Sequence, residues 1–237
     1  MTLWHLSRAI VETAMISVPT VADSALGRVT TRACDERLDR WSRRLLDQAK
    51  IELRAYDVES LPPGETFVVM SNHQSLYDIP VVFQALGRRV RMVAKKELFH
   101  VPVWAKAMKA AGFVEVDRKN RGAAIESLKH ARLALKEGTN IWIAPEGTRS
   151  RTGKLLPFKK GGFHLSLETG ARILPLTIVG TRDILLAKGW TVHPGGIVEL
   201  YVGEPVDPAH YGDERKDELI AEVRRRILRR MPSELQD

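Results

Sequence analysis

One histidine and one aspartate, five positions apart, follow an apolar run and could act together as a base. The run Phe67–Ser71 is typical of a buried strand, and the polar stretch Asn72–Asp78 follows it directly. In open α/β sheets, side chains at the carboxyl end of a strand face the crevice where ligands bind. Asp78 could accept the proton on one ring nitrogen of His73, which would stabilise the imidazolium formed when the other nitrogen takes a proton. The alternative is that Asp78 caps the following helix and His73 is an ordinary loop residue.

A second polar cluster follows another short apolar run. Residues Pro145–Ser150 come directly after the predicted strand Ile141–Ala144 and include Gly147 and Arg149. Gly147 permits a tight turn and a close approach of the backbone to a ligand. Arg149 offers a planar fork of donors that suits phosphate oxygens. A plain loop with a solvated arginine is the alternative interpretation.

Two more apolar runs end in cations. Lys95 follows the run Val90–Ala94, and Arg118 ends the segment that begins at Gly112. If this segment is extended, Arg118 points to the face opposite Glu115, so that carboxylate does not neutralise it. A base and three cations would then meet at one edge of a sheet, as in a site for a phosphorylated substrate that loses a proton: His73, Lys95, Arg118 and Arg149.

Strand-like and helix-like segments alternate from residue 52 onward. Predicted strands are Phe67–Ser71, Val90–Ala94, Phe113–Asp117, Ile141–Ala144, Ile173–Val179 and Ile197–Val202. Predicted helices are Ile79–Leu86, Val103–Ala111, Ala123–Lys136, Lys160–Glu168 and Asp213–Met231. The alternation predicts an α/β fold with a mostly parallel central sheet covered by helices on both faces. Segment Trp190–Val202 is typical of a hairpin that turns at Pro194–Gly196.

The first 53 residues have helical periodicity, with a predicted break near Pro19. Apolar stripes run along both predicted helices, and arginines surround the second stripe: Leu3, Trp4, Leu6, Ile10, Val11 and Ala14, then Leu38, Trp41 and Leu45. An amphipathic basic helix that carries tryptophan is typical of a segment lying in a lipid interface. The alternative is a helix packed on the protein's own core with its arginines in solvent.

Composition excludes several classes of protein. The chain has 237 residues, of which 44% are hydrophobic and 28% charged, and these are values of a globular protein. Its formal net charge of +8 favours anionic partners, but no strand interleaves aromatic and basic residues, so we do not expect nucleic-acid binding. The single cysteine, Cys34, excludes an internal disulfide framework and a multi-cysteine zinc site. Ser75 lacks the flanking glycines of a hydrolase nucleophile, and no run is long enough to span a membrane.

Taken together, the motifs resemble the glycerolipid acyltransferase family, specifically the 1-acylglycerol-3-phosphate acyltransferases. The resemblance covers roughly residues 52–206 and rests on four ordered blocks: His73 with Asp78, the segment Gly112–Arg118, Glu146–Ser150 and Ile173–Leu176. Two features depart from the family pattern. Glu115 stands where an uncharged residue is expected, and the N-terminal helices lack the spanning segment that many relatives have.

The resemblance implies a mechanism and a set of binding residues. His73, held by Asp78, would deprotonate a glycerol hydroxyl, whose oxygen attacks the thioester carbonyl of an acyl donor without a covalent acyl-enzyme. Family precedent places these residues on the glycerol phosphate: Arg118, Glu146, Gly147 and Arg149, with Lys95 as an addition. Pro175 would shape the acyl-donor end of the site.

We therefore expect an enzyme that transfers a fatty acyl chain from acyl-CoA or acyl-carrier protein to 1-acylglycerol 3-phosphate, forming phosphatidic acid without a metal or cofactor. The alternatives are another acceptor, such as glycerol 3-phosphate or a different lysophospholipid, and a basic peripheral membrane protein without turnover. We expect residues 1–53 to anchor the chain on the cytoplasmic face of the cell membrane, peripherally or monotopically. Residues 54–237 would form the acyltransferase domain.

Overall fold

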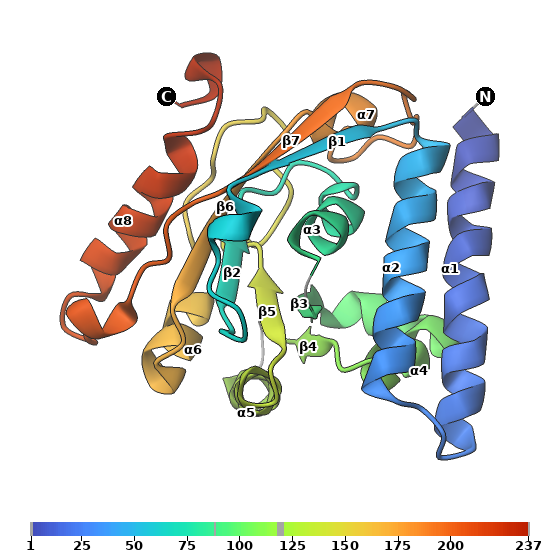
Figure 1. Ribbon diagram of the computed structural model, residues 1–237, viewed down its shortest axis with the longest axis horizontal. Helices are drawn as coiled ribbons and strands as arrows, with labels where there is room; N and C mark the ends of the chain where they lie inside the picture. The colour runs from blue at the N-terminus through green and yellow to red at the C-terminus, as the bar shows by residue number, and fades with distance from the viewer. Residues whose placement is uncertain (1, 88, 118–120, 237) are drawn as a thin grey trace.

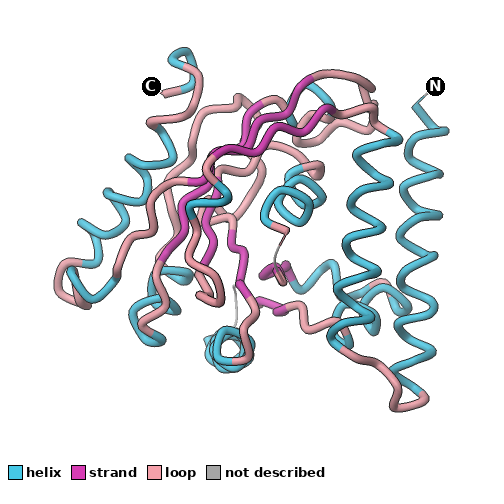
Figure 2. Tube along the Cα trace, viewed as in Figure 1, coloured by secondary structure: helices cyan, strands magenta, loops and turns pink. Residues whose placement is uncertain are grey.

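The computed structural model describes residues 2–87, 89–117 and 121–236, and its centre is a seven-stranded sheet (Figures 1 and 2). The strand order is β1-β7-β6-β2-β5-β3-β4. The strands are β1 (Glu52–Tyr56), β2 (Val68–Ser71), β3 (Val90–Lys95), β4 (Val114–Val116), β5 (Asn140–Ile143), β6 (Ile173–Val179) and β7 (Ile197–Val202). The α-helices are α1 (Thr2–Ala25), α2 (Thr31–Gln48), α3 (Asp78–Leu86), α4 (Pro102–Ala110), α5 (Arg121–Lys136), α6 (Gly161–Thr169), α7 (Thr181–Ile184) and α8 (Lys216–Leu228).

Five neighbouring strands run in one direction. β2 pairs in parallel with both β5 and β6, and β3 pairs in parallel with β5 and β4. β7 is antiparallel to β6, and β1 is parallel to β7. The predicted α/β fold with a mostly parallel sheet is confirmed. Because the carboxyl ends of β2 to β6 lie along one edge, the segments that follow them meet there.

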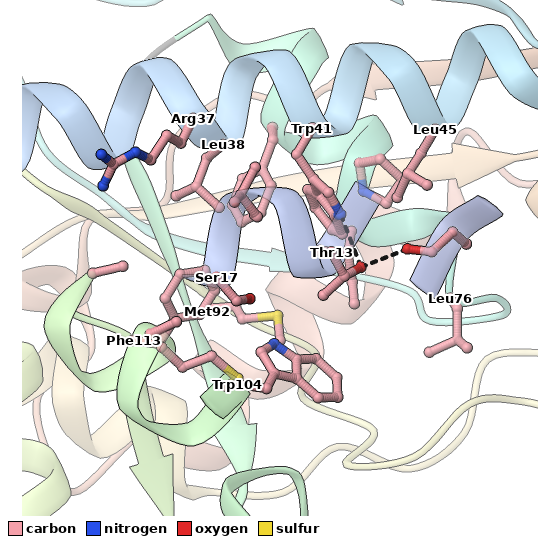
Figure 3. Close-up of a pocket in the computed structure, with 18 of the residues that line it drawn as sticks. Thr13, Ser17, Arg37, Leu38, Trp41, Leu45, Leu76, Met92, Trp104 and Phe113 are labelled. Carbon is pink, nitrogen blue, oxygen red and sulfur yellow. Dashed lines mark hydrogen bonds between the residues drawn. The ribbon is translucent and has the colours of Figure 1, made fainter. Parts of the chain in front are cut away.

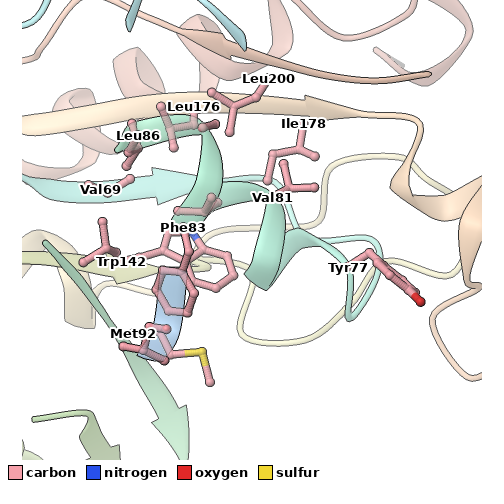
Figure 4. Close-up of a cluster of buried hydrophobic side chains, with 14 of the residues drawn as sticks. Val69, Tyr77, Val81, Phe83, Leu86, Met92, Trp142, Leu176, Ile178 and Leu200 are labelled. Carbon is pink, nitrogen blue, oxygen red and sulfur yellow. The ribbon is translucent and has the colours of Figure 1, made fainter. Parts of the chain in front are cut away.

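Helices cover the sheet on two faces, as the strand sequences require. Alternate residues of a strand point to opposite faces, so Val69 packs into a core cluster with α3, whereas Val68 and Met70 pack into another with α6 and α8. The first cluster is drawn in Figure 4, where Val69, Leu176 and Leu200 from three strands meet Val81 and Phe83 of α3. Figure 1 shows α1 and α2 beyond α3 on one side of the sheet and α6 and α8 on the other.

The strand predictions are confirmed to within one or two residues, but two features of the sheet were not predicted correctly. Strand β1 was assigned to the N-terminal helical region, and residue 53, the expected end of that region, lies inside it. The predicted hairpin Trp190–Val202 is wrong, because only Ile197–Val202 is a strand and its antiparallel partner is β6. The backbone N–H of Gly195 instead donates to the carbonyl of Ala49 at the end of α2.

The break between the first two helices lies after Pro19, not at it. Helix α1 continues through Pro19 to Ala25, and the chain turns at Gly27, whose φ of 64° is in the left-handed region that glycine adopts without strain. Helix α2 then begins beside Thr30, whose side chain accepts a hydrogen bond from the N–H of Ala33 as an N-cap. The helix α1 is thus ended by the turn at Gly27, and Pro19 does not end it.

The two N-terminal helices differ in where their apolar side chains lie. Leu38 and Leu45 of α2 are buried, and Trp41 is half-buried beside Phe83 with the ring centroids 6.3 Å apart. For α2 the interpretation of packing on the protein's own core is therefore correct. Helix α1 instead exposes apolar side chains on its outer face: Ile10, Val11, Met15 and Val18. The side chains of Leu3, Trp4 and Leu6 lie outside the described part of the structure.

Among the described residues, no helix combines the length and the hydropathy needed to cross a membrane.

Candidate active site

His73 and Asp78 form the predicted pair in the turn formed by residues 72–78, which follows β2. Nδ1 of His73 lies 2.6 Å from Oδ2 of Asp78. The same oxygen accepts the N–H groups of Gln74 at 2.8 Å and Ser75 at 2.9 Å, and Oδ1 accepts the hydroxyl of Thr181 at 2.5 Å. Asp78 is 0% exposed, whereas 17% of the His73 side chain is exposed. Three donors thus orient a buried carboxylate against one ring nitrogen of His73, which leaves Nε2 to exchange a proton with a ligand.

Polar side chains of the 72–78 turn attach it to different parts of the fold. The Asn72 amide bonds to both the N–H and the carbonyl of Ile178, at 2.8 Å each, and so continues the β2–β6 pairing by one position. Gln74 donates to the carbonyl of Gly153, and the Ser75 hydroxyl donates to the carbonyl of Leu185. The turn is therefore fixed on several sides before any ligand binds.

Glu146 contacts the backbone of the turn, not the open side of the site. Its Oε1 accepts the N–H of His73 at 2.7 Å, and its Oε2 accepts the N–H of Leu156 at 2.9 Å. The N–H of Ser150 donates to the carbonyl of His73 at 2.7 Å. Burial raises the pKa of Glu146 to about 7, and the two backbone hydrogen bonds act in the opposite direction. The predicted contact of Glu146 with phosphate stays a prediction, and the geometry gives this carboxylate a part in holding His73.

Two of the three predicted cations lie at the same edge of the sheet as His73. Lys95 ends β3 and is exposed, and Arg149 follows β5 and is half-buried. Neither side chain has a hydrogen bond or ion pair among the residues described. Burial lowers the pKa of Arg149, and the negative charge of Asp78 raises it. Gly147 turns the chain between β5 and Arg149 with a φ of 74°. The edge therefore offers one imidazole and two cations that an anion can approach.

The third predicted cation, Arg118, lies outside the described residues. Strand β4 ends at Val116 and is parallel to β3. Glu115 in β4 forms an ion pair with Lys109 of α4, with 3.2 Å between the charged atoms. Its negative charge is thus compensated within the protein.

Pro175 lies inside β6, opposite Met70 of β2. Its carbonyl accepts the N–H of Gly203 at 2.8 Å, and a Cβ on Gly203 would come within 2.9 Å of the proline ring. Proline has no N–H to give to β7, which accounts for the irregular pairing between the two strands at this point. Its predicted role in shaping the acyl-donor site stays a prediction.

Two residues that contact the His73–Asp78 pair were not found from the sequence. Thr181, the donor to Asp78, follows β6 after Gly180, and a polar residue after a parallel strand was the signal used for the other sites. Trp142 of β5 packs edge-on to the His73 ring with the centroids 6.0 Å apart, and its indole donates to Ser71. A buried tryptophan in a predicted strand carries no such signal.

An apolar cavity of about 240 Å³ lies beside the turn, between the N-terminal helices and the sheet layer (Figure 3). Leu76 and Tyr77 of the turn line it, together with side chains from α1, α2, α3 and α4. Few polar groups reach it, and the Trp41 indole donates to the Thr13 hydroxyl at 3.2 Å. Leu76 is 50% exposed and lies three positions after His73 in the turn. An apolar cavity lined by the turn that carries His73 suits a ligand with a hydrocarbon chain.

Comparison with known proteins agrees with this geometry. Residues 52–179 match the model of a family described as acyltransferase, which is more than half of the chain. The chain belongs to this acyltransferase family. A solved structure of the 1-acyl-sn-glycerophosphate (LPA) acyltransferase PlsC from Thermotoga maritima superposes with a TM-score of 0.80 at 30% identity, covering 96% of this chain and 92% of that one.

Curated relatives in the family carry related names. A chloroplastic 1-acyl-sn-glycerol-3-phosphate acyltransferase of Brassica napus is 34% identical over 175 residues, which is 73% of this chain and 49% of that protein. The alpha form of the mouse enzyme of that name is 33% identical over 158 residues, 66% of this chain and 55% of that protein. The chain thus spans about half the length of the curated relatives it matches.

Proposed function

We propose that the protein transfers a fatty acyl chain from a thioester donor to the free hydroxyl of 1-acylglycerol 3-phosphate, with phosphatidic acid as the product. The observation that carries the proposal is the position of the His73–Asp78 pair. A buried carboxylate with four hydrogen bonds holds an imidazole in the same turn whose Leu76 and Tyr77 line the apolar cavity. Two cations that have no partner among the described residues lie at the same edge of the sheet. The names of the relatives point to the same acceptor.

The geometry supports direct transfer by general-base catalysis. Nε2 of His73 takes the proton of the acceptor hydroxyl, while the hydroxyl oxygen forms a bond to the thioester carbonyl carbon. The carbon–sulfur bond then breaks, and the thiolate takes the proton back from the imidazolium. Asp78 stabilises the imidazolium between these steps, because its Oδ2 contacts Nδ1 at 2.6 Å. The donor is either acyl-CoA or acyl-carrier protein.

The cavity and the cations suit different parts of the substrates. A hydrocarbon chain gains about 0.8 kcal/mol for each buried CH₂ group, so the apolar cavity favours the acyl part of a substrate. Arg149 and Lys95 suit the phosphate of the acceptor, Arg149 as a fork of donors and Lys95 as a point charge. Arg118, Glu146 and Gly147 belong to the same proposed phosphate side of the site, with Glu146 acting through the backbone of His73.

A lipid acceptor requires a membrane surface, and α1 offers a contact. One face of α1 lines the cavity, with Thr13 and Ser17 among its residues. The opposite face carries the exposed apolar side chains Ile10, Val11, Met15 and Val18. We place this face in the lipid interface on the cytoplasmic side of the membrane, with the basic chain favouring anionic headgroups. Deletion of residues 2–30 or charge substitutions on this face should then weaken vesicle sedimentation.

An acceptor panel tests the proposed reaction. Purified protein is incubated with an acyl-CoA or acyl-carrier-protein donor and with lysophosphatidate, glycerol 3-phosphate, lysophosphatidylcholine or monoacylglycerol, and the products are identified by mass. We expect phosphatidic acid from lysophosphatidate as the fastest product. Equal rates with monoacylglycerol would contradict the phosphate side of the site, and faster reaction of glycerol 3-phosphate or lysophosphatidylcholine would replace the proposed acceptor. If His73→Ala keeps full activity, the proposed reaction is contradicted.

A further inference from the structure

The loop formed by residues 184–193 joins α7 to the segment before β7 and exposes a tryptophan. Trp190 is 73% exposed, the highest value among the large hydrophobic side chains that the structure describes, and Leu186 is 48% exposed. Lys188 stands between them and is also exposed. Scattered apolar side chains on a surface are ordinary, so exposure alone does not assign a role to this loop.

The loop is fixed at its base. The N–H of His193 donates to the carbonyl of Ile184 at 2.9 Å and closes the loop, and the N–H of Gly189 donates to the carbonyl of Leu186 within it. Ile184 is buried at 2% exposed. Trp190 and Leu186 are therefore carried outward on a closed, anchored loop, and their exposure is set by the fold.

The loop is also attached to the two parts of the molecule that the proposed reaction uses. The carbonyl of Leu185 accepts the hydroxyl of Ser75, which belongs to the same turn as His73, at 2.8 Å. Just after the loop, Gly195 donates to Ala49 at the end of α2, and Figure 1 shows this segment beside the end of α2. Leu185 and Val192 line the apolar cavity from within, while their neighbours Leu186 and Trp190 are directed to solvent.

We propose that the 184–193 loop is a second lipid contact, separate from α1, which inserts Trp190 and Leu186 into the membrane interface beside the cavity that Leu185 and Val192 line. The inference rests on the proposed function, because an acceptor with an acyl chain resides in a bilayer and must reach His73 from it. Tryptophan suits the interface, since its ring is apolar and its N–H is polar, and Lys188 suits anionic headgroups. With α1 it gives two contacts, from two segments that both line the cavity, and two contacts fix the orientation of the protein on the membrane.

Trp190→Ala in the full-length protein tests the contact. On sedimented vesicles of equimolar phosphatidylglycerol and phosphatidylcholine, we expect partitioning about tenfold weaker than wild type, because a half-inserted indole removes on the order of 60 Å² of apolar surface from water. The matched control is Leu133→Ala, which removes a side chain 56% exposed on α5 and should leave partitioning unchanged. Equal partitioning of wild type and Trp190→Ala would overturn the proposal.

A local probe separates insertion from a general loss of binding. In a Cys34→Ala background, Thr191→Cys is labelled with an environment-sensitive fluorophore next to an intact Trp190. Addition of the same vesicles should shift its emission to the blue, and a label at Lys136→Cys on α5 should not respond. A label at residue 191 that stays in water on bound protein would also contradict the loop contact. If Trp190→Ala instead dissociates a dimer or abolishes only acyl-carrier-protein binding, the occupant of the loop is a protein and the lipid proposal is wrong.

Activity distinguishes failure of this inference from failure of the proposed reaction. On a short-chain lysophosphatidate below its micelle concentration, Trp190→Ala should turn over like wild type, whereas on vesicles it should be about tenfold slower at limiting lipid. If wild type itself does not acylate the soluble acceptor, the proposed function fails whatever the vesicles show. If both variants act equally on vesicles, the function stands and the loop contact does not.

Discussion

The two sides of the site differ in how their side chains are held. His73 is fixed through its ring by Asp78, and through its backbone by Glu146 and Ser150, all by hydrogen bonds of 2.6 to 2.7 Å. Lys95 and Arg149 stand at the same edge with no partner among the described residues. The difference matches the two tasks proposed for these residues: a base must be oriented before reaction, because small misplacements cost rate, whereas an anion-binding cation gains from keeping its charge available.

The largest effect is expected at the base itself. His73→Ala removes the proposed proton acceptor, and turnover should fall by about 10²–10⁴-fold, the range for loss of a general base. Folding should be retained, because 17% of the side chain is exposed and the backbone bonds to the turn do not depend on it. Turnover of lysophosphatidate at saturation measures the effect, with exposed His130→Ala on α5 as the matched control. A residual rate within tenfold of wild type would make some other group the base.

Asp78→Asn should lower turnover by about 10²-fold with little change in KM. The asparagine carbonyl can keep the three donors that now bond to Oδ2, while its NH₂ faces the Thr181 hydroxyl, which can accept. The turn and the tautomer of His73 are thus retained, and what is lost is the charge that stabilises the imidazolium. Steady-state kinetics over a range of acceptor concentrations give kcat and KM separately. A rise in KM with unchanged kcat would show that Asp78 serves binding.

Glu146→Gln tests the indirect hold on His73, with about tenfold slower turnover expected. One of the two N–H groups that Glu146 accepts would face an NH₂ donor, and leaving a buried N–H unsatisfied costs about 1–3 kcal/mol. The variant isolates a positioning role if kcat falls while KM for the phosphate acceptor is unchanged. A KM effect confined to phosphate-bearing acceptors would instead restore the direct contact implied by the family resemblance.

The same variant should change how stability depends on pH. Burial raises the pKa of Glu146 to about 7 from its ordinary 4.5, so the folded state binds this proton more tightly than the unfolded state does. The stability that this proton gives the folded state is therefore fully present below about pH 4.5 and is lost as the pH rises through about 7, by about 3 kcal/mol in all. Denaturant unfolding of both proteins at pH 5 and pH 8 measures it, since other groups titrate alike in the two. A wild-type minus variant difference that is the same at both pH values would contradict this account.

Much of the base side and of the sheet could be predicted because their signals are local. Apolar runs of four to seven residues separated by helical periodicity give the parallel strands, and polar residues directly after them give His73, Asp78 and Arg149. Strand β1 was missed because its partner β7 lies more than 140 positions away, as in the pair Glu52 and Ile197. No local pattern records such a pairing.

The hold on His73 by Glu146 could not be predicted for the same reason. The two residues are 73 positions apart, and a glutamate in a polar loop gives no sign that it is 3% exposed. The buried face of α2 shows a related limit: an apolar stripe flanked by arginines is the same whether it faces lipid or a protein core, and only the tertiary contacts of Leu38 and Trp41 decide. On α1, the periodicity alone could not show which face of the helix is exposed and which packs inward.

On the cation side, Arg149→Lys should raise KM for lysophosphatidate about fivefold and leave kcat nearly unchanged. Lysine keeps the positive charge but loses the planar fork that can donate twice to a phosphate. Monoacylglycerol, which lacks the phosphate, supplies the internal control, and its kinetics should be alike in wild type and variant. If kcat falls and KM does not, Arg149 acts on the transition state, and the contrast between the two sides of the site is weaker than proposed.

Lys95→Ala should have the smallest effect, a rise of about two- to threefold in KM for phosphate acceptors, because an exposed charge acts through water and is screened by salt. The neighbouring Lys96 provides the matched control: it is also exposed, but its ammonium is 3.0 Å from a carboxylate oxygen of Asp117. If partner-free cations are what the site offers an anion, Lys95→Ala raises KM at low salt and the difference disappears at high salt, while Lys96→Ala changes nothing. Equal effects of the two substitutions would mean that the acceptor responds to the overall positive field of this edge, not to particular side chains.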